Sequence, residues 1–403
     1  MTVGSWVRSH VGPIGLVGLL LVGLAIRLIV LSWPGHGGDI QVTARWAERM
    51  ALSGPWDFYE HDGSVYPALL YAYWPLGAWF DGNALLHAVK GLSIPFDLAL
   101  GVVIYRVALR FTSGLRALGA PALYLLNPAV LLAGPIWGQV DAAGTLAYLG
   151  ALLAVTAGRY RASGAMAALA MLVKPQFGLV ALPVAVVALI RGRAAGTVRP
   201  LVRVVTGAAA AYVVVALPLR LDPFRYAQRV MNAGTFQPST SLNAPNPWGM
   251  LVGYRIPDGP LFWVGAALLA IGLAFALLPL RYRRDLPTIL AVGLFVAFAF
   301  YFLPTRVHER YLFPAMALAA PLSVASWRVL VAYLVLTAAF ALTILYALVD
   351  TTSFTIARPL QDLLITRTAV IWIGLTLLAV AATLAVLLLT EPTDRPVSTL
   401  PEP

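Results

Sequence analysis

The chain of 403 residues contains no cysteine, so disulfide bonds and thiolate metal sites are excluded. Lysine occurs only at Lys90 and Lys174, and charged residues of all kinds make up 11% of the sequence. A soluble domain of this length carries a far larger share of charged side chains on its surface. The shortage of charge therefore indicates a chain whose surface faces lipid.

Motifs of several enzyme classes are missing as well. The sequence has no glycine-rich phosphate loop of the Walker or dinucleotide-binding type, and no His/Asp cluster with metal-ligand spacing. A nucleotide-dependent cytosolic enzyme is therefore disfavoured. The net charge of +11 is spread over short segments, which favours membrane orientation and lipid contact over nucleic-acid binding.

Hydrophobic residues make up 60% of the chain, and its mean hydropathy is +0.82. We therefore predict an all-α polytopic membrane protein, with one transmembrane domain over residues 1–390 and a short disordered tail at 391–403. A span needs about 20 apolar residues, and by that rule the chain offers about eleven or twelve candidates. The first, Ile14 to Leu31, lacks a small-residue cleavage site and is expected to be retained. The others lie near residues 66–80, 92–109, 117–133, 142–157, 163–173, 177–190, 202–218, 260–279, 287–303, 311–325, 329–349 and 368–389.

The connections between these runs divide into two sets when 66–80 is treated as a partly immersed helix rather than a span. The 163–190 region also allows two interpretations. One set is short and basic, and Arg8 and His10 before the first run favour placing it in the cytoplasm. The opposite set, expected to be extracytoplasmic, includes a first loop at 34–65 and a long loop at 220–259. Every unusual polar motif falls in this second set.

One of these motifs is a charged turn, Pro304 to Pro314, between two apolar runs. It contains Arg306, His308, Glu309 and Arg310, although a charged group at mid-bilayer costs about 3 kcal/mol. Three groups that can carry positive charge in one tight connection suit an anion at the membrane surface. A phosphate is the obvious candidate.

Two further motifs lie in and after the first loop. Asp39, in Gly37-Gly38-Asp39-Ile40-Gln41, is either a base for an incoming hydroxyl or the N-cap of an amphipathic helix from Ile40 to Leu52. Tyr66-Pro67 opens an aromatic-rich segment. Its aromatic side chains either anchor the chain at the interface or line a channel for an isoprenoid chain, and they include Tyr66, Tyr71 and Trp74.

Polar residues also interrupt apolar runs farther along the chain. Gln139 and Asp141, in Trp137-Gly138-Gln139-Val140-Asp141, could hydrogen-bond sugar hydroxyls, or Asp141 could cap the helix that begins at Ala142. In Lys174-Pro175-Gln176, proline breaks the helix, and the lysine either snorkels or joins a site with Gln176.

The long loop contains a proline-rich stretch, Phe236 to Gly249, which indicates a fixed irregular path. Asn243 and Asn246 could bind sugar hydroxyls, while Trp248 could stack on the C–H face of a sugar. A structured loop that binds no ligand is the alternative.

Taken together, these motifs resemble the GT-C superfamily of glycosyltransferases. More narrowly, the chain is similar to bacterial mannosyltransferase-like proteins related to the enzymes that build glycosylphosphatidylinositol anchors. Its first loop is also similar to that of the dolichyl-phosphate-glucose-dependent transferases. The resemblance covers about residues 10–320 and depends on Gly38-Asp39, Trp137-Gly138-Gln139-Val140-Asp141, Lys174-Pro175-Gln176, Ser241-Leu242-Asn243-Ala244 and Arg306-Val307-His308-Glu309-Arg310-Tyr311-Leu312-Phe313-Pro314.

The resemblance implies a polyprenyl-phosphate-hexose donor, with mannose favoured over glucose, used outside the cytoplasm with no metal cofactor. It places the catalytic base at Asp39, and it implies an inverting displacement of the lipid phosphate. In this scheme cationic side chains would stabilise the negative charge that develops on the leaving phosphate, and Glu309 would orient its neighbours through ion pairs. Many members of the superfamily have a pair of acidic residues in the first loop. Here the residue two positions after Asp39 is Gln41, so the first-loop motif has a single acid. The cations expected at the phosphate are Arg306, His308, Arg310 and Lys174.

The protein is expected to be integral to the cytoplasmic membrane, with its site on the extracytoplasmic face, and the expected acceptor is a glycan, glycolipid or glycoprotein on that face. Two other functions remain open. A ligase or polymerase of lipid-linked glycans would use a similar topology but a diphosphate-linked oligosaccharide donor. A transporter or flippase would tend to place polar groups near mid-membrane and to show an inverted repeat, and neither pattern is visible in the sequence.

Overall fold

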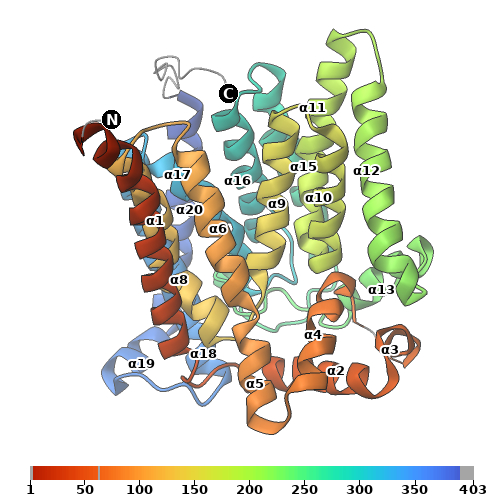
Figure 1. Ribbon diagram of the computed structural model, residues 1–403. Helices are drawn as coiled ribbons and strands as arrows, with labels where there is room; N and C mark the ends of the chain where they lie inside the picture. The colour runs from red at the N-terminus through yellow and green to blue at the C-terminus, as the bar shows by residue number, and fades with distance from the viewer. Residues whose placement is uncertain (1–2, 62–63, 391–403) are drawn as a thin grey trace.

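The computed structural model describes residues 3–61 and 64–390, and the tail expected to be disordered, 391–403, lies outside this part. The described residues form helices joined by short turns and contain no β-strand, only isolated bridges. The helices pack as one bundle (Figure 1). The prediction of an all-α polytopic membrane protein is confirmed.

Seven segments of the described chain are long and apolar enough to cross a membrane. An eighth would be formed by α7 (Leu115–Leu125) with the segment Pro128–Ile136, which bend by 41° at Asn127. The expected eleven or twelve spans exceed this number because four of the expected runs form helices too short to be counted: α9 (Asp141–Thr156), α10 (Tyr160–Val173), α16 (Leu286–Phe302) and α17 (Phe313–Ser323). The seven are Gly12–Val30 of α1 (Val3–Val30), Gly82–Ala108 of α5 (Gly82–Gly91) and α6 (Ser93–Ala108), Pro175–Ala194 of η2 (Pro175–Val180) and α11 (Ala181–Ala194), Arg199–Leu219 of α12 (Arg199–Ala216) and η3 (Leu217–Leu219), Leu261–Arg281 of α15 (Leu261–Leu277) and η4 (Leu278–Arg281), Trp327–Thr351 of α18, and Arg367–Thr390 of α20.

The two ends of the bundle differ in architecture. One end consists of tight turns, and α1 begins and α20 ends there (Figure 1). The other end, below called the motif end, contains the short helices α2 (Gly37–Ser53), α3 (Pro55–His61), α4 (Pro67–Trp79), α13 (Pro223–Thr235) and α19 (Arg358–Leu364). The short helix α14 (Pro247–Leu251) belongs to the long loop and contacts α20. α4 packs on α2 and is not among the candidate spans, as predicted for 66–80.

A short central helix positions the charged turn. All residues of α17 (Phe313–Ser323) are buried, and the helix contacts α6, α7, α9, α16 and α18. Its alanines let neighbouring backbones approach closely. The 3-10 helix η5 (Glu309–Leu312) precedes α17 directly. The charged turn is therefore held in the middle of the motif end.

Candidate functional site

Asp39 is not the cap of its helix. The helix begins at Gly37, and its N-cap is His36, whose Nδ1 accepts a hydrogen bond from the backbone N–H of Asp39 at 3.1 Å. Asp39 lies in the first turn, where the helix dipole favours a carboxylate. The cap alternative is therefore wrong, and the side chain of Asp39 has other contacts.

The Asp39 carboxylate is fixed through one of its oxygens. Trp137 Nε1–H donates to Oδ2 at 2.9 Å, and the Gln139 amide donates to the same oxygen at 2.6 Å. Arg310 Nη2 lies 4.0 Å from Oδ2. His36 Nδ1, which already accepts the backbone hydrogen bond, lies 3.4 Å from Oδ1. Because the side chain is 34% exposed, Oδ1 is the oxygen left to accept a proton.

Local backbone features bring these groups together. The bent segment after Asn127 contains α8 (Pro128–Leu131) and a π-helical turn at Leu132–Ile136, a rare form that often occurs at functional sites. It ends at Trp137, whose backbone carbonyl accepts from His36 N–H at 3.3 Å. A Cβ on Gly35 would lie 2.3 Å from the carbonyl oxygen of Ile136. Only glycine therefore permits this approach.

Lys174 is buried, and Gln139 connects it to Asp39. Its Nζ donates to Asp141 Oδ1 at 2.6 Å and to Gln139 Oε1 at 2.7 Å, and both charged side chains are at most 5% exposed. α9 begins at Asp141 with Val140 as its N-cap, so Asp141 is not the cap either. Because Lys174 engages the amide oxygen of Gln139, the NH2 group of Gln139 faces Asp39.

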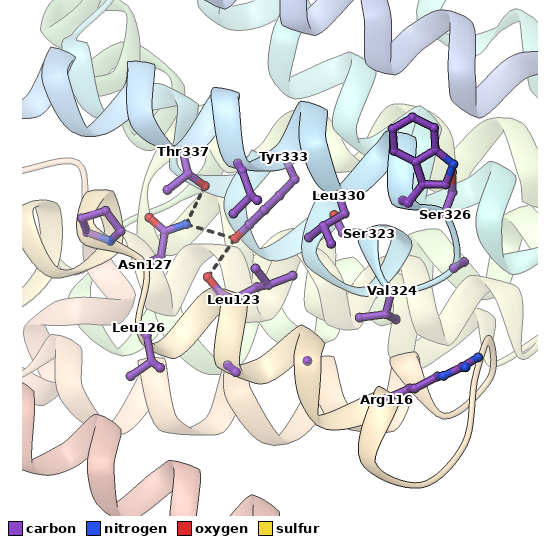
Figure 2. A pocket seen from close by; sticks show the side chains of 16 residues that line it. Arg116, Leu123, Leu126, Asn127, Ser323, Val324, Ser326, Leu330, Tyr333 and Thr337 are labelled. Atoms are coloured by element: carbon purple, nitrogen blue, oxygen red, sulfur yellow. Dashed lines mark hydrogen bonds between the residues drawn. The ribbon is translucent and has the colours of Figure 1, made fainter.

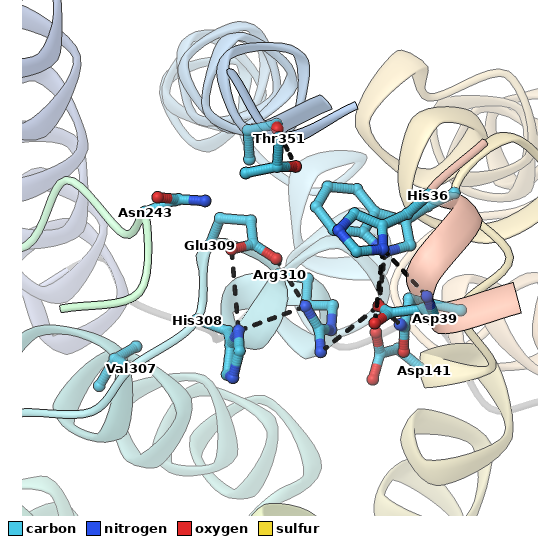
Figure 3. A network of polar contacts seen from close by, with 12 residues as sticks. His36, Asp39, Asp141, Asn243, Val307, His308, Glu309, Arg310 and Thr351 are labelled. Carbon is cyan, nitrogen blue, oxygen red and sulfur yellow. Dashed lines mark hydrogen bonds and ion pairs between the residues drawn. The ribbon is translucent and has the colours of Figure 1, made fainter. Parts of the chain in front are cut away.

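The charged groups at this end, below called the Asp39 cluster, are His36, Asp39, Asp141, Lys174, His308, Glu309 and Arg310. Arg310 lies between Glu309 and Asp39 (Figure 3). Its Nη1 donates to Glu309 Oε1 at 2.7 Å, and the guanidinium lies 5.6 Å from the centre of the Trp137 ring. His308 Nδ1 is 3.4 Å from Arg310 Nη1. Two nitrogens of Arg310 therefore face carboxylates, and the third, Nε, is buried without a hydrogen-bond partner among the described residues.

These surroundings set the charge states. Burial by itself would raise the pKa of Asp39, but Arg310, His36 and the Trp137 hydrogen bond hold that pKa below its ordinary value. Burial and then Arg310 depress the pKa of His308 well below its usual value, so His308 is neutral at pH 7. Burial raises the pKa of Glu309 despite its pair with Arg310. The cluster thus combines an ionised carboxylate with a neutral imidazole.

Arg306 lies in a different network from Arg310. Its guanidinium pairs with Asp258, with Nε at 2.7 Å from Oδ2 and Nη2 at 3.1 Å from Oδ1, and it stacks 4.2 Å above the Phe262 ring. Its backbone is left-handed, with φ of 63°, which is uncommon outside glycine. Asp258 is 1% exposed. Arg306 therefore fastens the end of the long loop to the charged turn.

The long loop follows the fixed path expected of it, and its polar residues hold that path. Asn246 caps α14 through the Gly249 N–H, and Trp248 donates to the Leu303 carbonyl at 2.8 Å. The left-handed Asn243 accepts from Arg255 at 3.2 Å and pairs with the backbone at His308. These contacts favour the structured-loop alternative for Asn246 and Trp248.

Gln176 and the three aromatic residues named from the sequence differ in their surroundings. The half-buried Gln176 borders a cavity of about 20 Å³ beside Tyr311. Burial raises the pKa of Tyr66, which is close enough to Arg310 and Asp39 to feel both charges. Tyr71 donates to the Val215 carbonyl at 3.0 Å, and Trp74 packs against Trp56. Of the three aromatics named from sequence, only Tyr66 thus borders the cluster.

His36 and Trp137 were not predicted as site residues. Their rings stack with centroids 4.9 Å apart and planes 1° apart, and each hydrogen-bonds Asp39 as described above. Histidine is not among the favoured N-cap residues, so no local signal identified His36. Trp137 belongs to the motif Trp137-Gly138-Gln139-Val140-Asp141, and the polar residues Gln139 and Asp141 beside it were the only indication that it lies at the site.

Within residues 3–61 and 64–390, no group of three or more His, Asp or Glu side chains is arranged to hold a metal ion. Comparison of the chain with protein-family models and with curated proteins finds no match.

Proposed function

We propose that this protein is an integral membrane glycosyltransferase that moves a hexose from a polyprenyl-phosphate donor to an acceptor hydroxyl. The observation that carries the proposal is the Asp39–Arg310 pair at the motif end. A carboxylate that is ionised at neutral pH and has one free oxygen lies beside an arginine whose buried Nε–H has no partner among the described residues. An acceptor hydroxyl and a phosphate need this combination of groups at adjacent positions.

In the proposed reaction, the Oδ1 of Asp39 removes the proton of the acceptor hydroxyl. The acceptor oxygen attacks the anomeric carbon from the face opposite the lipid phosphate, and the bond between that carbon and the phosphate oxygen breaks. The electron pair of this bond goes to the phosphate, which leaves with one more negative charge. The anomeric configuration is inverted, and no metal ion takes part in this scheme.

Arg310 and His308 are the groups proposed to receive that charge. Nε of Arg310 is free to donate, and neutral His308 can donate from one ring nitrogen. Removing one such preorganised donor costs roughly 100- to 1,000-fold in rate. Lys174 and Arg306 act through other residues in this scheme, because their charges are already engaged by Asp141 and Asp258.

The test is transfer of radiolabelled mannose from polyprenyl-phosphate-mannose to cell-envelope acceptors by the purified full-length protein in vesicles. Glucose is the second donor tried. Asp39→Asn should lower turnover at least about 100-fold, as expected for a general base. Asp81→Asn is the matched control, since Asp81 is exposed at the same end and makes no cap hydrogen bond. It should match the wild type.

Equal turnover by Asp39→Asn and wild type would remove Asp39 from the mechanism. If neither monophosphate-linked sugar is used but a diphosphate-linked oligosaccharide is, the protein is a ligase or polymerase. Movement of intact donor across vesicles without sugar transfer would identify a flippase.

We also propose that the motif end faces outside the cytoplasmic membrane. Because the chain has no cysteine, single cysteines can report topology directly. Asp81→Cys in intact cells should react with a membrane-impermeant maleimide, whereas Arg110→Cys, in the turn after α6 at the other end, should react only after the membrane is broken. The reverse pattern would place the site in the cytoplasm.

A further inference from the structure

A second region with room for a ligand lies away from the motif end. It lies between α7 and the start of α18, has a volume of about 700 Å³, and is lined mainly by apolar side chains. This volume is within the range of ligand pockets, about 300–1,000 Å³. Figure 2 shows Arg116 and Ser326 at one end of the cavity, and Asn127 with Thr337 at the other.

The inner end of the cavity is polar but satisfied. The Asn127 amide donates to Tyr333 and Thr337 hydroxyls at 3.0 Å each, and its Oδ1 accepts from the backbone N–H of Ala129 and Val130. The Tyr333 hydroxyl donates in turn to the Leu123 carbonyl. Because these groups have partners already, this end offers a ligand no unmet hydrogen bond. The part of a ligand that can bind at this end without losing hydrogen bonds is therefore a hydrocarbon chain.

The mouth of the cavity is positively charged. Arg116 is exposed and forms no ion pair among the described residues. No acidic residue occurs from 98 to 140 or from 310 to 349, the two stretches that supply the walls. Trp327, 71% exposed, lies at the same rim, and tryptophan is typical of the membrane–water interface. The rim thus combines an unpaired cation with an interfacial ring.

We propose that this cavity binds one acyl chain of an acidic phospholipid, with the lipid phosphate on the Arg116 guanidinium. The satisfied inner end receives the chain terminus, and the charged rim fixes which end of the lipid enters first. The lipid comes from the leaflet opposite the Asp39 cluster, because Arg116 lies in the first turn of α7, just after the turn that follows α6 at that end of the bundle (Figure 1). This site does not depend on the proposed glycosyl transfer.

The test is native mass spectrometry of the detergent-purified full-length protein with phosphatidylglycerol or phosphatidylcholine of identical chains. We expect one site that prefers phosphatidylglycerol about fivefold, the value for about 1 kcal/mol per surface arginine. Arg116→Gln should abolish the preference, and Ala122→Phe should fill the cavity and remove the site for both lipids. Arg110→Gln, an exposed arginine nearby that does not line the cavity, should bind as wild type does.

Several outcomes would overturn the proposal. They are an unchanged preference in Arg116→Gln, full binding by Ala122→Phe, displacement of the lipid by excess inorganic phosphate, and much tighter binding of polyprenyl phosphate. If Ala122→Phe does not fold, the acyl-chain length is varied on the wild type instead. Affinity should then fall as the chain is shortened, and affinity that does not change with chain length contradicts a site for the acyl chain.

Discussion

Lys174→Met separates two explanations of the lysine that the sequence places at a helix break. In the structure its ammonium is buried between Asp141 and Gln139 and does not face an open site. The substitution keeps most of the volume and removes the charge. It leaves the Asp141 carboxylate, 2% exposed, without its cation, and it frees the Gln139 amide from the contact that sets its direction.

The expected loss of stability is large. Removing one partner of a buried ion pair typically costs about 3–5 kcal/mol, whereas replacing both partners by apolar residues is often neutral. Lys174→Met should therefore lower the unfolding free energy by about 3 kcal/mol. The double variant Lys174→Met/Asp141→Leu should recover most of that loss. Asp141 Oδ2 is already buried without a partner among the described residues, so the double variant also removes an unsatisfied oxygen.

Activity should not recover with stability. In the double variant the amide oxygen of Gln139 has lost its lysine partner, and only the hydrogen bond to Asp39 still orients the amide. We therefore expect kcat to stay at least about tenfold low while KM for the donor changes little. Thermal unfolding in detergent and steady-state transfer assays measure the two quantities. A Lys174→Met protein of normal stability with a strongly raised donor KM would refute this reasoning, because that is the signature of a lysine that binds the donor phosphate.

Two further predictions concern the neighbouring groups. Trp137→Phe removes an N–H that stabilises the Asp39 carboxylate, so the pKa of Asp39 should rise and the acidic limb of the kcat/KM profile should move to higher pH. Arg306→Ala strips the cation from buried Asp258 and should cost about 3 kcal/mol of stability. Because the folded-state pKa of Asp258 is depressed, its stabilising contribution is present above the ordinary carboxyl pKa and is lost as pH falls through the folded value. An acidic limb that does not move in Trp137→Phe contradicts the first prediction, and a melting temperature that does not change in Arg306→Ala contradicts the second.

The sequence was sufficient for the fold class and for the end at which the polar motifs gather. In a chain so poor in charge, long apolar runs are explained by helices that span a bilayer. The alternation of basic and polar connections follows because the chain crosses the membrane repeatedly. The number of spans was harder to predict. α9, α10 and α16 are apolar but short, and hydropathy does not tell a short helix packed inside a bundle from a span.

The partners of the charged residues could not be read from the sequence. Asp39 and Trp137 lie 98 positions apart and meet through a π-helical turn and a glycine contact, neither of which has a local signature. Arg306 and Arg310 are four positions apart and looked equivalent, yet a left-handed residue at 306 turns one side chain toward Asp258. A residue type shows what chemistry is possible, whereas burial and partners decide whether the charge is still free to act.

The charge of the Asp39 cluster should also affect binding of the proposed donor. The cluster contains three carboxyl groups and two permanent cations, so its formal charge is negative before the anionic phosphodiester binds. The carboxyl groups are those of Asp39, Asp141 and Glu309, and the cations are Lys174 and Arg310. The neutral His308 is the group able to correct this, because a phosphate beside it raises the pKa of its imidazole. Donor binding should therefore take up a proton and tighten as the pH falls from His308's bound-state pKa toward its depressed free-state value. Calorimetry of donor binding in buffers of different ionisation enthalpy measures that proton, and His308→Gln should abolish its uptake. Uptake that persists in His308→Gln would assign the proton to Glu309, whose pKa is already raised, and binding without any uptake would show that Arg310 alone balances the phosphate.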